Sequence, residues 1–408
     1  MPVHSAIPSF VLDSVRSLPP LPAAVNKLLT LARDPDADFR QITAVIETDQ
    51  TLTARTLKAS NSAIYGQPKR VETVRQATVL LGREALLSLA VGASVTSLQE
   101  KLKHPWPGDP VAFWRHSLAV GMMARSIARR LRTVEPETAF VAGLLHDIGK
   151  LVMLNHFGDL YAQVLMAAQY GTQPLHLLER ETVEVDHAVV GHALCLHWNL
   201  PASLTHAVAE HHDSTPPAAG SIADIVRNAN DLIKMVRFGE SGNRYAELRP
   251  SRFLPHNKIP PSILREMIVY LPVEMREAER IFGNEIPPMP SEGDPTPKYL
   301  VHVNVSVPEE RELLSFLLFS RRCEPIHLDG GFKSEAPADA ELIGLITDTP
   351  LDPARSLAYS NNNVPVLDYG AWRSASGQPT REGNLDVSML NNWLSENLLK
   401  STSQAAAA

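Results

Sequence analysis

The sequence predicts two domains of different fold class, an all-α domain followed by a small α/β domain. Up to about residue 240, apolar residues recur at the spacing of amphipathic helices, and no segment alternates between apolar and polar residues with a period of two. Five prolines between residues 287 and 297 then indicate a stiff, extended linker. Beyond it, strand-like and helix-like segments alternate, which is typical of a parallel sheet packed against helices.

These changes of pattern divide the chain of 408 residues, a length that suits two or three domains. We assign residues 1–245 to the all-α domain and residues 246–297 to a helical extension that ends in the proline-rich linker. Residues 298–402 form the α/β domain, and residues 403–408 are a low-complexity tail that we expect to be disordered.

Apolar spacing and capping residues justify the N-terminal helices. Val25 and Leu28 fall on one face of a helix over residues 23–32. The next helix follows Asp38, and Gln41 three residues later completes the pattern of a capping box. Further helices are expected over residues 51–60, 74–81, 83–92, 113–131, 137–155, 187–198, 203–212 and 222–236.

The elements of the C-terminal half are shorter. Residues 262–282 keep helical spacing within the extension. Four short strands are expected after the linker, over residues 299–305, 324–328, 342–346 and 364–367. Helices over residues 308–319 and 389–399 complete the predicted α/β domain.

The composition excludes several classes of protein. With 45 acidic residues against 38 lysines and arginines, the formal net charge is −7, which argues against nucleic acid or an anionic membrane as the partner. The longest apolar stretches, such as residues 139–145, are far shorter than the ~20 residues of a membrane span. The only cysteines, Cys195 and Cys323, form no CxxC pair, and we see no secretion signal. We therefore expect a cytoplasmic protein without disulfides or a zinc-thiolate site.

The strongest local signal is the run Gly143-Leu144-Leu145-His146-Asp147-Ile148-Gly149-Lys150. Burying an adjacent histidine and aspartate is unfavourable unless both side chains find partners. A divalent metal, such as iron, manganese or zinc, would satisfy an imidazole nitrogen and a carboxylate oxygen together. Lys150 would then steady the negative charge that develops when a phosphoester is attacked.

Further ligands would have to come from other predicted helices. His116 lies one helix earlier, and His187, His211 and His212 lie on two later helices. The residues alone leave a second interpretation open. The His146–Asp147 pair could be a hydrogen-bonded core pair, and the two adjacent histidines could simply favour the dipole at a helix end.

A set of short motifs in a fixed order resembles the HDOD domain. In chain order they are Leu18-Pro19-Pro20-Leu21-Pro22, Asp49-Gln50-Thr51-Leu52-Thr53-Ala54-Arg55, Ala59-Ser60-Asn61-Ser62-Ala63-Ile64-Tyr65, Leu81-Gly82, Trp114-Arg115-His116-Ser117, Gly143-Leu144-Leu145-His146-Asp147, Asp186-His187-Ala188, Trp198-Asn199-Leu200-Pro201 and His211-His212. Each motif is weak by itself, but the ordered set is specific. The resemblance covers residues 14–240.

HDOD domains belong to the HD superfamily of all-α, metal-dependent phosphohydrolases and are related to the HD-GYP phosphodiesterases. The resemblance therefore implies an all-α fold and a bacterial signalling role. It implies metal ligands at His116, His146, Asp147, His187, His211 and His212.

Two departures from the HD-GYP pattern bear on activity. The carboxylate that should close the first metal site falls on Asn230, a neutral and weaker ligand, although Asp224 and Asp231 lie nearby in the sequence. The GYP segment is absent, because residues 213–217 read Asp-Ser-Thr-Pro-Pro. The resemblance thus gives no expectation of cyclic di-GMP hydrolysis.

The α/β segment resembles a degenerate receiver domain. Asp348 stands where a phospho-acceptor would end the third strand. Asn304 and Ser306 stand where a receiver has acidic residues that bind magnesium, and no lysine lies between residues 375 and 383. Because an aspartyl phosphate needs those charges, we expect no phosphorylation of this domain.

The sequence leaves two functions open. The first is a bacterial signal-transduction protein that acts through contacts with other signalling proteins. The second is a metal-dependent phosphohydrolase that acts on a nucleotide or another phosphoester, with Lys150 as a catalytic residue. A third interpretation is that the histidine pocket binds a nucleotide without hydrolysing it.

Overall fold

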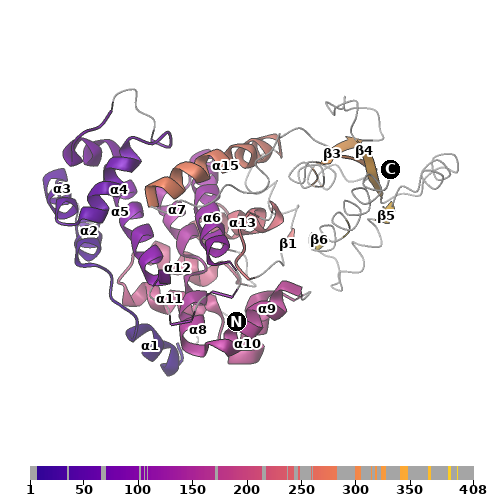
Figure 1. The fold of residues 1–408 in the computed structure, drawn as a ribbon, viewed down its shortest axis with the longest axis horizontal. Helices are drawn as coiled ribbons and strands as arrows, with labels where there is room; N and C mark the ends of the chain where they lie inside the picture. Colours follow the sequence, from indigo (N-terminus) through magenta and orange to yellow (C-terminus); the bar gives the residue numbers. More distant parts are fainter. Residues whose placement is uncertain are drawn as a thin grey trace. The chain divides into compact units, whose positions relative to one another are not determined.

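The structure of the protein is a computed structural model (Figure 1). It describes residues 7–248 apart from 35, 66–69, 101–102, 105, 108, 171–172, 214–216, 237 and 243–246, residues 259–282 apart from 260, five short strands after residue 298, and residues 314, 318 and 393. The chain divides into two compact units. The first comprises Met1–Arg244 and Tyr270–Pro287, and the second comprises Tyr245–Val269 and Pro288–Ala408.

Every regular element described between residues 7 and 242 is a helix, as the sequence predicts. The helices are α1 (Ser9–Arg16), α2 (Ala23–Arg33), α3 (Phe39–Glu47), α4 (Gln50–Ser60), α5 (Val74–Glu100), α6 (Pro110–Leu131), α7 (Pro136–Leu145), α8 (Ile148–Phe157), α9 (Asp159–Tyr170), α10 (Leu175–Val183), α11 (His187–His197), α12 (Ala202–Glu210) and α13 (Ile222–Val236). The sequence analysis named no helix at α1, α9 or α10.

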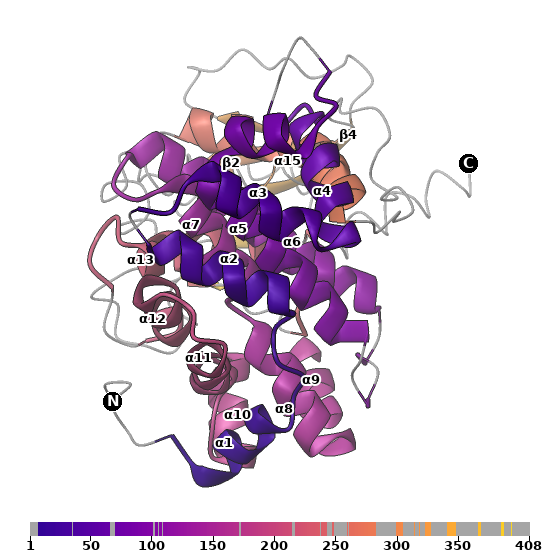
Figure 2. The same cartoon turned by 90° about the vertical axis from the view of Figure 1, so that its left-hand side faces the viewer.

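The first group of helices packs around α5, which contacts α2, α3 and α4 (Figure 2). The predicted capping box at the start of α3 is confirmed, because the Asp38 carboxylate accepts hydrogen bonds from the backbone and the Gln41 side chain accepts one from the Asp38 N–H. Gly82, at φ 76°, leaves the helical conformation inside α5. The predicted separation of two helices at this glycine is therefore confirmed.

The second group of helices surrounds the candidate site. Helix α6 packs on α7 and α13, α8 packs on α11, and α12 contacts α7, α11 and α13 (Figure 1). Gly149 permits the contact between α8 and α11, since a Cβ atom there would come within 2.6 Å of the Gly191 backbone nitrogen. The helix ends that carry the site are thereby held together.

The single helix predicted over residues 137–155 is wrong, and the difference matters for the site. Helix α7 ends at Leu145, and α8 begins at Ile148. Asp147 leaves the helical conformation, with φ −99° and ψ 8°. The break takes both the His146 and the Asp147 side chains into the interior of the bundle, where each is completely buried. Apolar periodicity does not detect such a break, because both flanking helices are buried on nearly every side.

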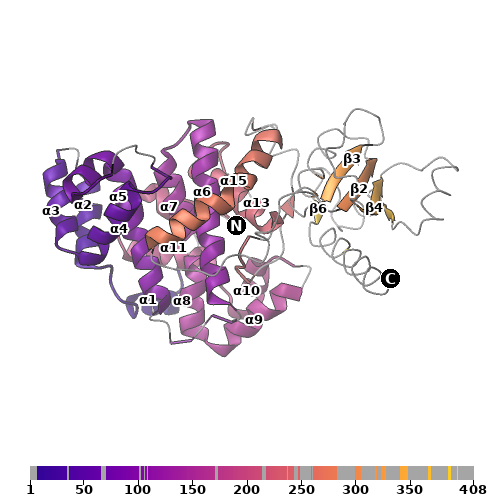
Figure 3. The ribbon, with the colours of Figure 1, turned by 45° about the horizontal axis from the view of Figure 1, so that its top comes forward.

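Helix α15 (Pro261–Phe282) is drawn in orange in Figure 3, and its residues from Tyr270 onward belong to the first unit. Its C-terminal part packs on α6, where the Phe282 ring meets the Trp114 ring edge-on at 5.6 Å. The Glu279 carboxylate lies 3.0 Å from the Arg115 guanidinium in an ion pair that is largely buried. This helix coincides with the helical segment expected at residues 262–282.

The second unit contains a four-stranded sheet. Its strands are β2 (Tyr299–Asn304), β3 (Cys323–His327), β4 (Glu341–Thr347) and β5 (Val366–Asp368), which coincide with the four predicted strands. All neighbouring strands are parallel, and their order is β3-β2-β4-β5. A separate antiparallel pair joins β1 (Glu247–Leu248) to β6 (Leu385–Asp386).

Several expectations lie outside the described residues. These are the linker at residues 287–297, the tail at 403–408, Ser306 and Asp348, and the predicted helices at 308–319 and 389–399 except for residues 314, 318 and 393, which are helical. Asn304 is the last residue of β2. A receiver domain is therefore not shown.

One described helix has the length and apolar composition that could cross a membrane, namely the stretch Val74–Leu98 of α5. Two-thirds of its most apolar window, 67%, is buried inside the protein. This burial is typical of a core helix.

Candidate metal centre

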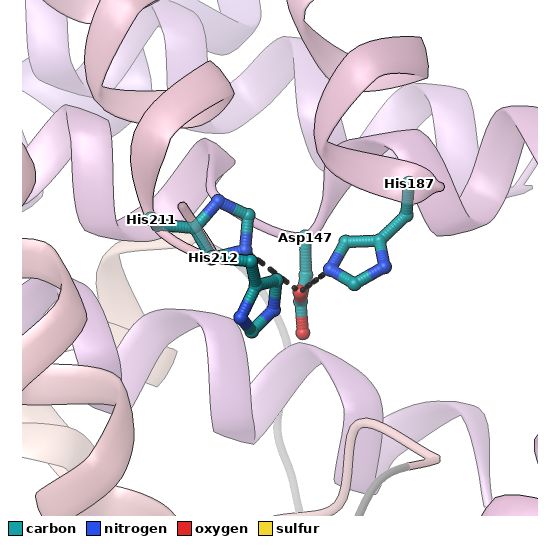
Figure 4. Close-up of side chains that lie close together, drawn as sticks. All are labelled: Asp147, His187, His211 and His212. Atoms are coloured by element: carbon teal, nitrogen blue, oxygen red, sulfur yellow. Dashed lines mark ion pairs between the residues drawn. The ribbon is translucent and has the colours of Figure 1, made fainter. Parts of the chain in front are cut away.

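All seven metal ligands suggested by the sequence lie together at the centre of the first unit. The α7–α8 break supplies His146 and Asp147, and the other ligands come from four further helices. These are His116 on α6, His187 at the start of α11, His211 and His212 directly after α12, and Asn230 on α13. Figure 4 shows three of the histidines gathered around Asp147.

Two groups of ligand atoms share the Asp147 carboxylate. One group consists of His116, His146 and Asp147. The other consists of Asp147, His187, His211 and His212. Within each group the ligand atoms lie within 4.8 Å of one another. Each group approaches a different oxygen of the carboxylate. Asp147 is therefore placed to bridge two cations.

The distances support this division. His187 Nε2 lies 3.2 Å and His211 Nε2 3.8 Å from Asp147 Oδ1. His146 Nε2 lies 3.3 Å and His116 Nε2 3.9 Å from Asp147 Oδ2. Separations of this size suit ligands that share a cation, since metal–nitrogen and metal–oxygen bonds are each about 2 Å long.

The polar atoms that face one another have no hydrogen-bond partners among the described residues. They are Asp147 Oδ1 and the Nε2 atoms of His146, His187, His211 and His212. Buried polar atoms without partners are rare in folded proteins and need an explanation. An unpaired carboxylate oxygen with the Nε2 atoms of His187 and His211 beside it, and the unpaired Nε2 of His146 beside the other oxygen, is explained by cations bound between these atoms.

Backbone carbonyls fix the protonation of two of these rings. His146 Nδ1 lies 2.7 Å from the Gly143 carbonyl oxygen, and His211 Nδ1 lies 2.7 Å from the Val208 carbonyl oxygen. A carbonyl only accepts, so Nδ1 must carry the proton in each ring. The lone pair on Nε2 is then directed into the site, which is the arrangement found in metal-ligating histidines.

His187 is held by a carboxylate that the sequence analysis did not identify. Glu179 on α10 accepts hydrogen bonds from His187 Nδ1 at 2.6 Å and from the His187 backbone N–H at 2.9 Å. The Tyr161 hydroxyl donates to the other oxygen of Glu179 at 2.5 Å. All three side chains are completely buried. This chain of bonds orients His187 toward Asp147.

Asn230 lies in the site but does not face Asp147 directly. Its Oδ1 atom is 3.1 Å from His116 Nε2 and accepts a hydrogen bond when that nitrogen is protonated; a cation bound by both side chains would take the place of that proton. Asp224 does not replace the missing carboxylate, because its oxygens accept from the Gly220 N–H and the Asn228 amide. Asp231 belongs to neither ligand group. Among the described residues, the two ligand groups therefore contain a single carboxylate.

Two buried lysines add positive charge. Lys150 donates to Asp147 Oδ2 at 2.6 Å and to the Ser241 carbonyl oxygen at 3.1 Å. Burial would raise the pKa of Asp147, but His146 and Lys150 lower it well below its usual value. Burial, together with the nearby Lys150, lowers the pKa of Lys234 to about 8. Asp147 is therefore ionised at neutral pH and available as a ligand.

Most of the histidines are neutral at the same pH. Burial lowers the pKa of His211 to about 3 and takes the pKa of His116 and His212 well below the ordinary value. Burial would also lower the pKa of His187, but Glu179 raises it instead. Neutral imidazole is the form that binds metal. The donor set of imidazoles, one carboxylate and one amide fits iron, manganese or zinc.

Changing Glu179 to glutamine is expected to weaken metal binding about 10–100-fold, which is the usual effect of losing the partner of a metal-ligating histidine. The variant keeps the size of the side chain but removes the charge that holds His187. Competition against a coloured chelator would measure the change. Glu181→Gln, an exposed position on the same helix, is the matched control, and an equal effect of both variants would contradict the role of Glu179.

Comparison with known proteins identifies the helical unit. The model of the HDOD domain family matches residues 18–214, which include all the site residues except Asn230. Residues 18–214 form an HDOD domain. An HDOD domain protein of unknown function from Geobacter sulfurreducens is 25% identical, with a TM-score of 0.55 over 67% of this chain and 98% of that chain.

Another structure shares the fold. It belongs to a Marinobacter aquaeolei protein named for a proposed role in signal transduction, which is 20% identical, with a TM-score of 0.57 over 69% of this chain and 62% of that chain. An uncharacterized protein from Treponema pallidum is 24% identical over 62% of this chain and 47% of its own length. Ribonuclease Y from Desulfotalea psychrophila is 30% identical over 31% of this chain and 18% of its own length. The chain thus spans less than half the length of these two relatives.

Proposed function

We propose that the HDOD domain binds two divalent cations and acts on a phosphoester, with a nucleotide as the substrate class. The observation that carries this proposal is the set of unpaired buried Nε2 atoms around the Asp147 carboxylate, one oxygen of which is itself unpaired. A structural core pair would leave no such atoms, since buried polar groups in a core normally find partners. The partial match to a relative named as a ribonuclease agrees with phosphoester chemistry.

The residues of the site have different roles in this proposal. Divalent cations at the site would supply Lewis acidity and a water activated near neutral pH. Asp147 and the histidines hold them, and Glu179 fixes the direction of His187. Lys150 carries a positive charge beside Asp147, where it can contact a phosphoryl oxygen of the substrate. Lys150 is the candidate catalytic residue.

A second candidate function is regulation through protein contacts, without turnover. It is favoured by the neutral Asn230 in place of a second carboxylate and by the burial of the ligand atoms. In that case the HDOD domain would be a metal-stabilised module of a bacterial, cytoplasmic signalling protein with signalling proteins as partners. The two functions differ in whether substrate is consumed.

The second unit fits a signalling role as a receiver-like domain. The strand order β3-β2-β4-β5 is the order of the first four strands of the flavodoxin-like fold, which receivers share. The neutral Asn304 at the end of β2 favours a contact domain over a phosphorylation switch.

Metal analysis of the purified protein, followed by a panel of nucleotides and other phosphoesters, tests the proposal. We expect close to two equivalents of iron, manganese or zinc, and hydrolysis that is lost in His146→Ala. The exposed residue His206 provides the control variant His206→Ala. Wild-type protein without bound metal would refute the metal site. Bound metal without turnover would favour the second function.

A further inference from the structure

One short segment beside the site is neither helix nor strand. After α13 the chain turns back, and residues 238–242, here called the strap, lie between α6 and α8. The Phe238 N–H donates to the Ile233 carbonyl at 3.1 Å, and the Glu240 N–H donates to the Ala112 carbonyl at 2.8 Å. The strap is therefore tied to the helix that carries His116.

The strap contacts His116 of the first ligand group and Lys150, the counter-ion of Asp147. Gly239 lies so close to α6 that a Cβ atom there would come within 2.8 Å of the His116 Cα and within 2.6 Å of the Ala112 oxygen. Two residues later, the Ser241 carbonyl accepts from Lys150 at 3.1 Å. The ammonium group of Lys150, which lies beside Asp147, is thus hydrogen-bonded to the backbone of the strap.

The closed strap leaves the site out of reach of a substrate. His146, Asp147 and Lys150 are completely buried, and His116 is 1% exposed. Within the strap, Phe238, Gly239 and Glu240 are half-buried, whereas Ser241 is 2% exposed and its hydroxyl has no hydrogen-bond partner in the described part of the chain. Among the described residues, helices α6, α7 and α13 pack against one another around this half of the site.

We infer that the strap is a removable cover that must leave α6 and Lys150 before a phosphate-bearing ligand can enter the site. This inference rests on the proposed function. The ends of the strap favour such a movement, because Gly239 and Gly242 both have left-handed backbone conformations, with φ 73° and 74°. Opening breaks the Lys150–Ser241 bond and frees a donor of Lys150 for a phosphoryl oxygen.

Thiol labelling of the full-length protein tests whether the strap opens by itself. The variant combines Ser241→Cys with Cys323→Ser and keeps Cys195, which is fully buried in α11, as the internal reference. We expect the thiol introduced at position 241 to react at least tenfold faster than Cys195. Its rate should change little with urea, whereas the Cys195 rate should rise steeply, because only the latter requires extensive unfolding. Equal rates with equal urea dependence would overturn the inference.

Metal extraction tests whether the strap covers the site. We expect EDTA to remove Mn²⁺ about tenfold faster from the Gly239→Ala variant, because the added methyl group displaces the strap from α6. Gly82→Ala is the matched control, since Gly82 has a similar φ of 76° but no atom within 4 Å of the added carbon. Unchanged extraction from Gly239→Ala would overturn the inference. Failure of the wild-type protein to bind Mn²⁺ would refute the proposed function instead, and the labelling result would then decide whether the strap opens.

Discussion

Replacing Asp147 with asparagine should abolish metal binding, with an affinity loss of at least about 100-fold. Asp147 is the one residue common to both ligand groups and the only carboxylate in either of them. Without it, the cations would face only neutral imidazoles and an amide, with the positive charge of Lys150 nearby. Loss of a residue that merely orients a ligand already weakens binding by about 10–100-fold, so loss of the bridging ligand should exceed that range.

The same change should destabilise the metal-free protein. Lys150 is completely buried, and the Asp147 carboxylate at 2.6 Å is its counter-ion. Removing one partner of a buried ion pair leaves an uncompensated charge and typically costs about 3–5 kcal/mol. The double variant Asp147→Asn with Lys150→Met removes both charges and should recover most of that stability. It should still bind no metal.

Metal content after dialysis, together with urea unfolding, measures both effects. Asp224→Asn is the matched control, because Asp224 forms hydrogen bonds with Gly220 and Asn228 away from the ligand groups. Full metal occupancy in the stable double variant would contradict the bridging role of Asp147. It would also support the interpretation of His146 and Asp147 as an ordinary core pair.

The helical fold could be predicted from the sequence where periodicity and capping agree. The helix after Asp38 is an example, since its capping box lies within four residues and depends on no distant contact. The break at Asp147 could not be predicted in this way. It depends on contacts with α11, α12 and α13, which are distant in the sequence and supply the surroundings that make burial of the carboxylate favourable.

The ligands of the candidate site could be predicted better than their supports. His116, His146 and Asp147 follow an ordered motif pattern, and the structure brings them together. Glu179 was missed because it lies in Leu175–Val183, where it begins a run of three charged residues that is typical of the exposed face of a helix. Only the buried position of that helix face makes Glu179 a partner of His187. A single sequence carries no signal for such a long-range hydrogen bond.

The metal-free protein should lose stability as the pH falls from 7.5 to 5.0, because several histidines are held neutral in the folded state. Burial lowers the pKa of His176 and of His211 to about 3, against an ordinary value near 6.5 in the unfolded chain. Below pH 6.5 the unfolded chain binds protons that the folded protein does not, so the free energy of unfolding falls until about pH 3.

Protonation linked to each of these two histidines should lower the free energy of unfolding by roughly 2 kcal/mol at pH 5, since one pKa unit corresponds to about 1.4 kcal/mol. The lowered pKa values of His116 and His212 act in the same direction. His187 acts in the opposite direction, because its pKa is raised and its stabilisation is lost as the pH rises. Asp147 contributes only below about pH 4, where its unfolded form becomes protonated.

Urea unfolding of the metal-free protein at pH 7.5 and 5.0 measures the loss, and His176 provides the decisive variant. His176 is not a member of either ligand group, yet its ring stacks on that of His212 at 4.6 Å in a largely buried position. His176→Gln removes its titration and should reduce the loss of stability by roughly 2 kcal/mol. His206→Gln, at an exposed position, should leave the loss unchanged. If both variants kept the full pH dependence, the acid sensitivity would have to come from groups other than this buried histidine.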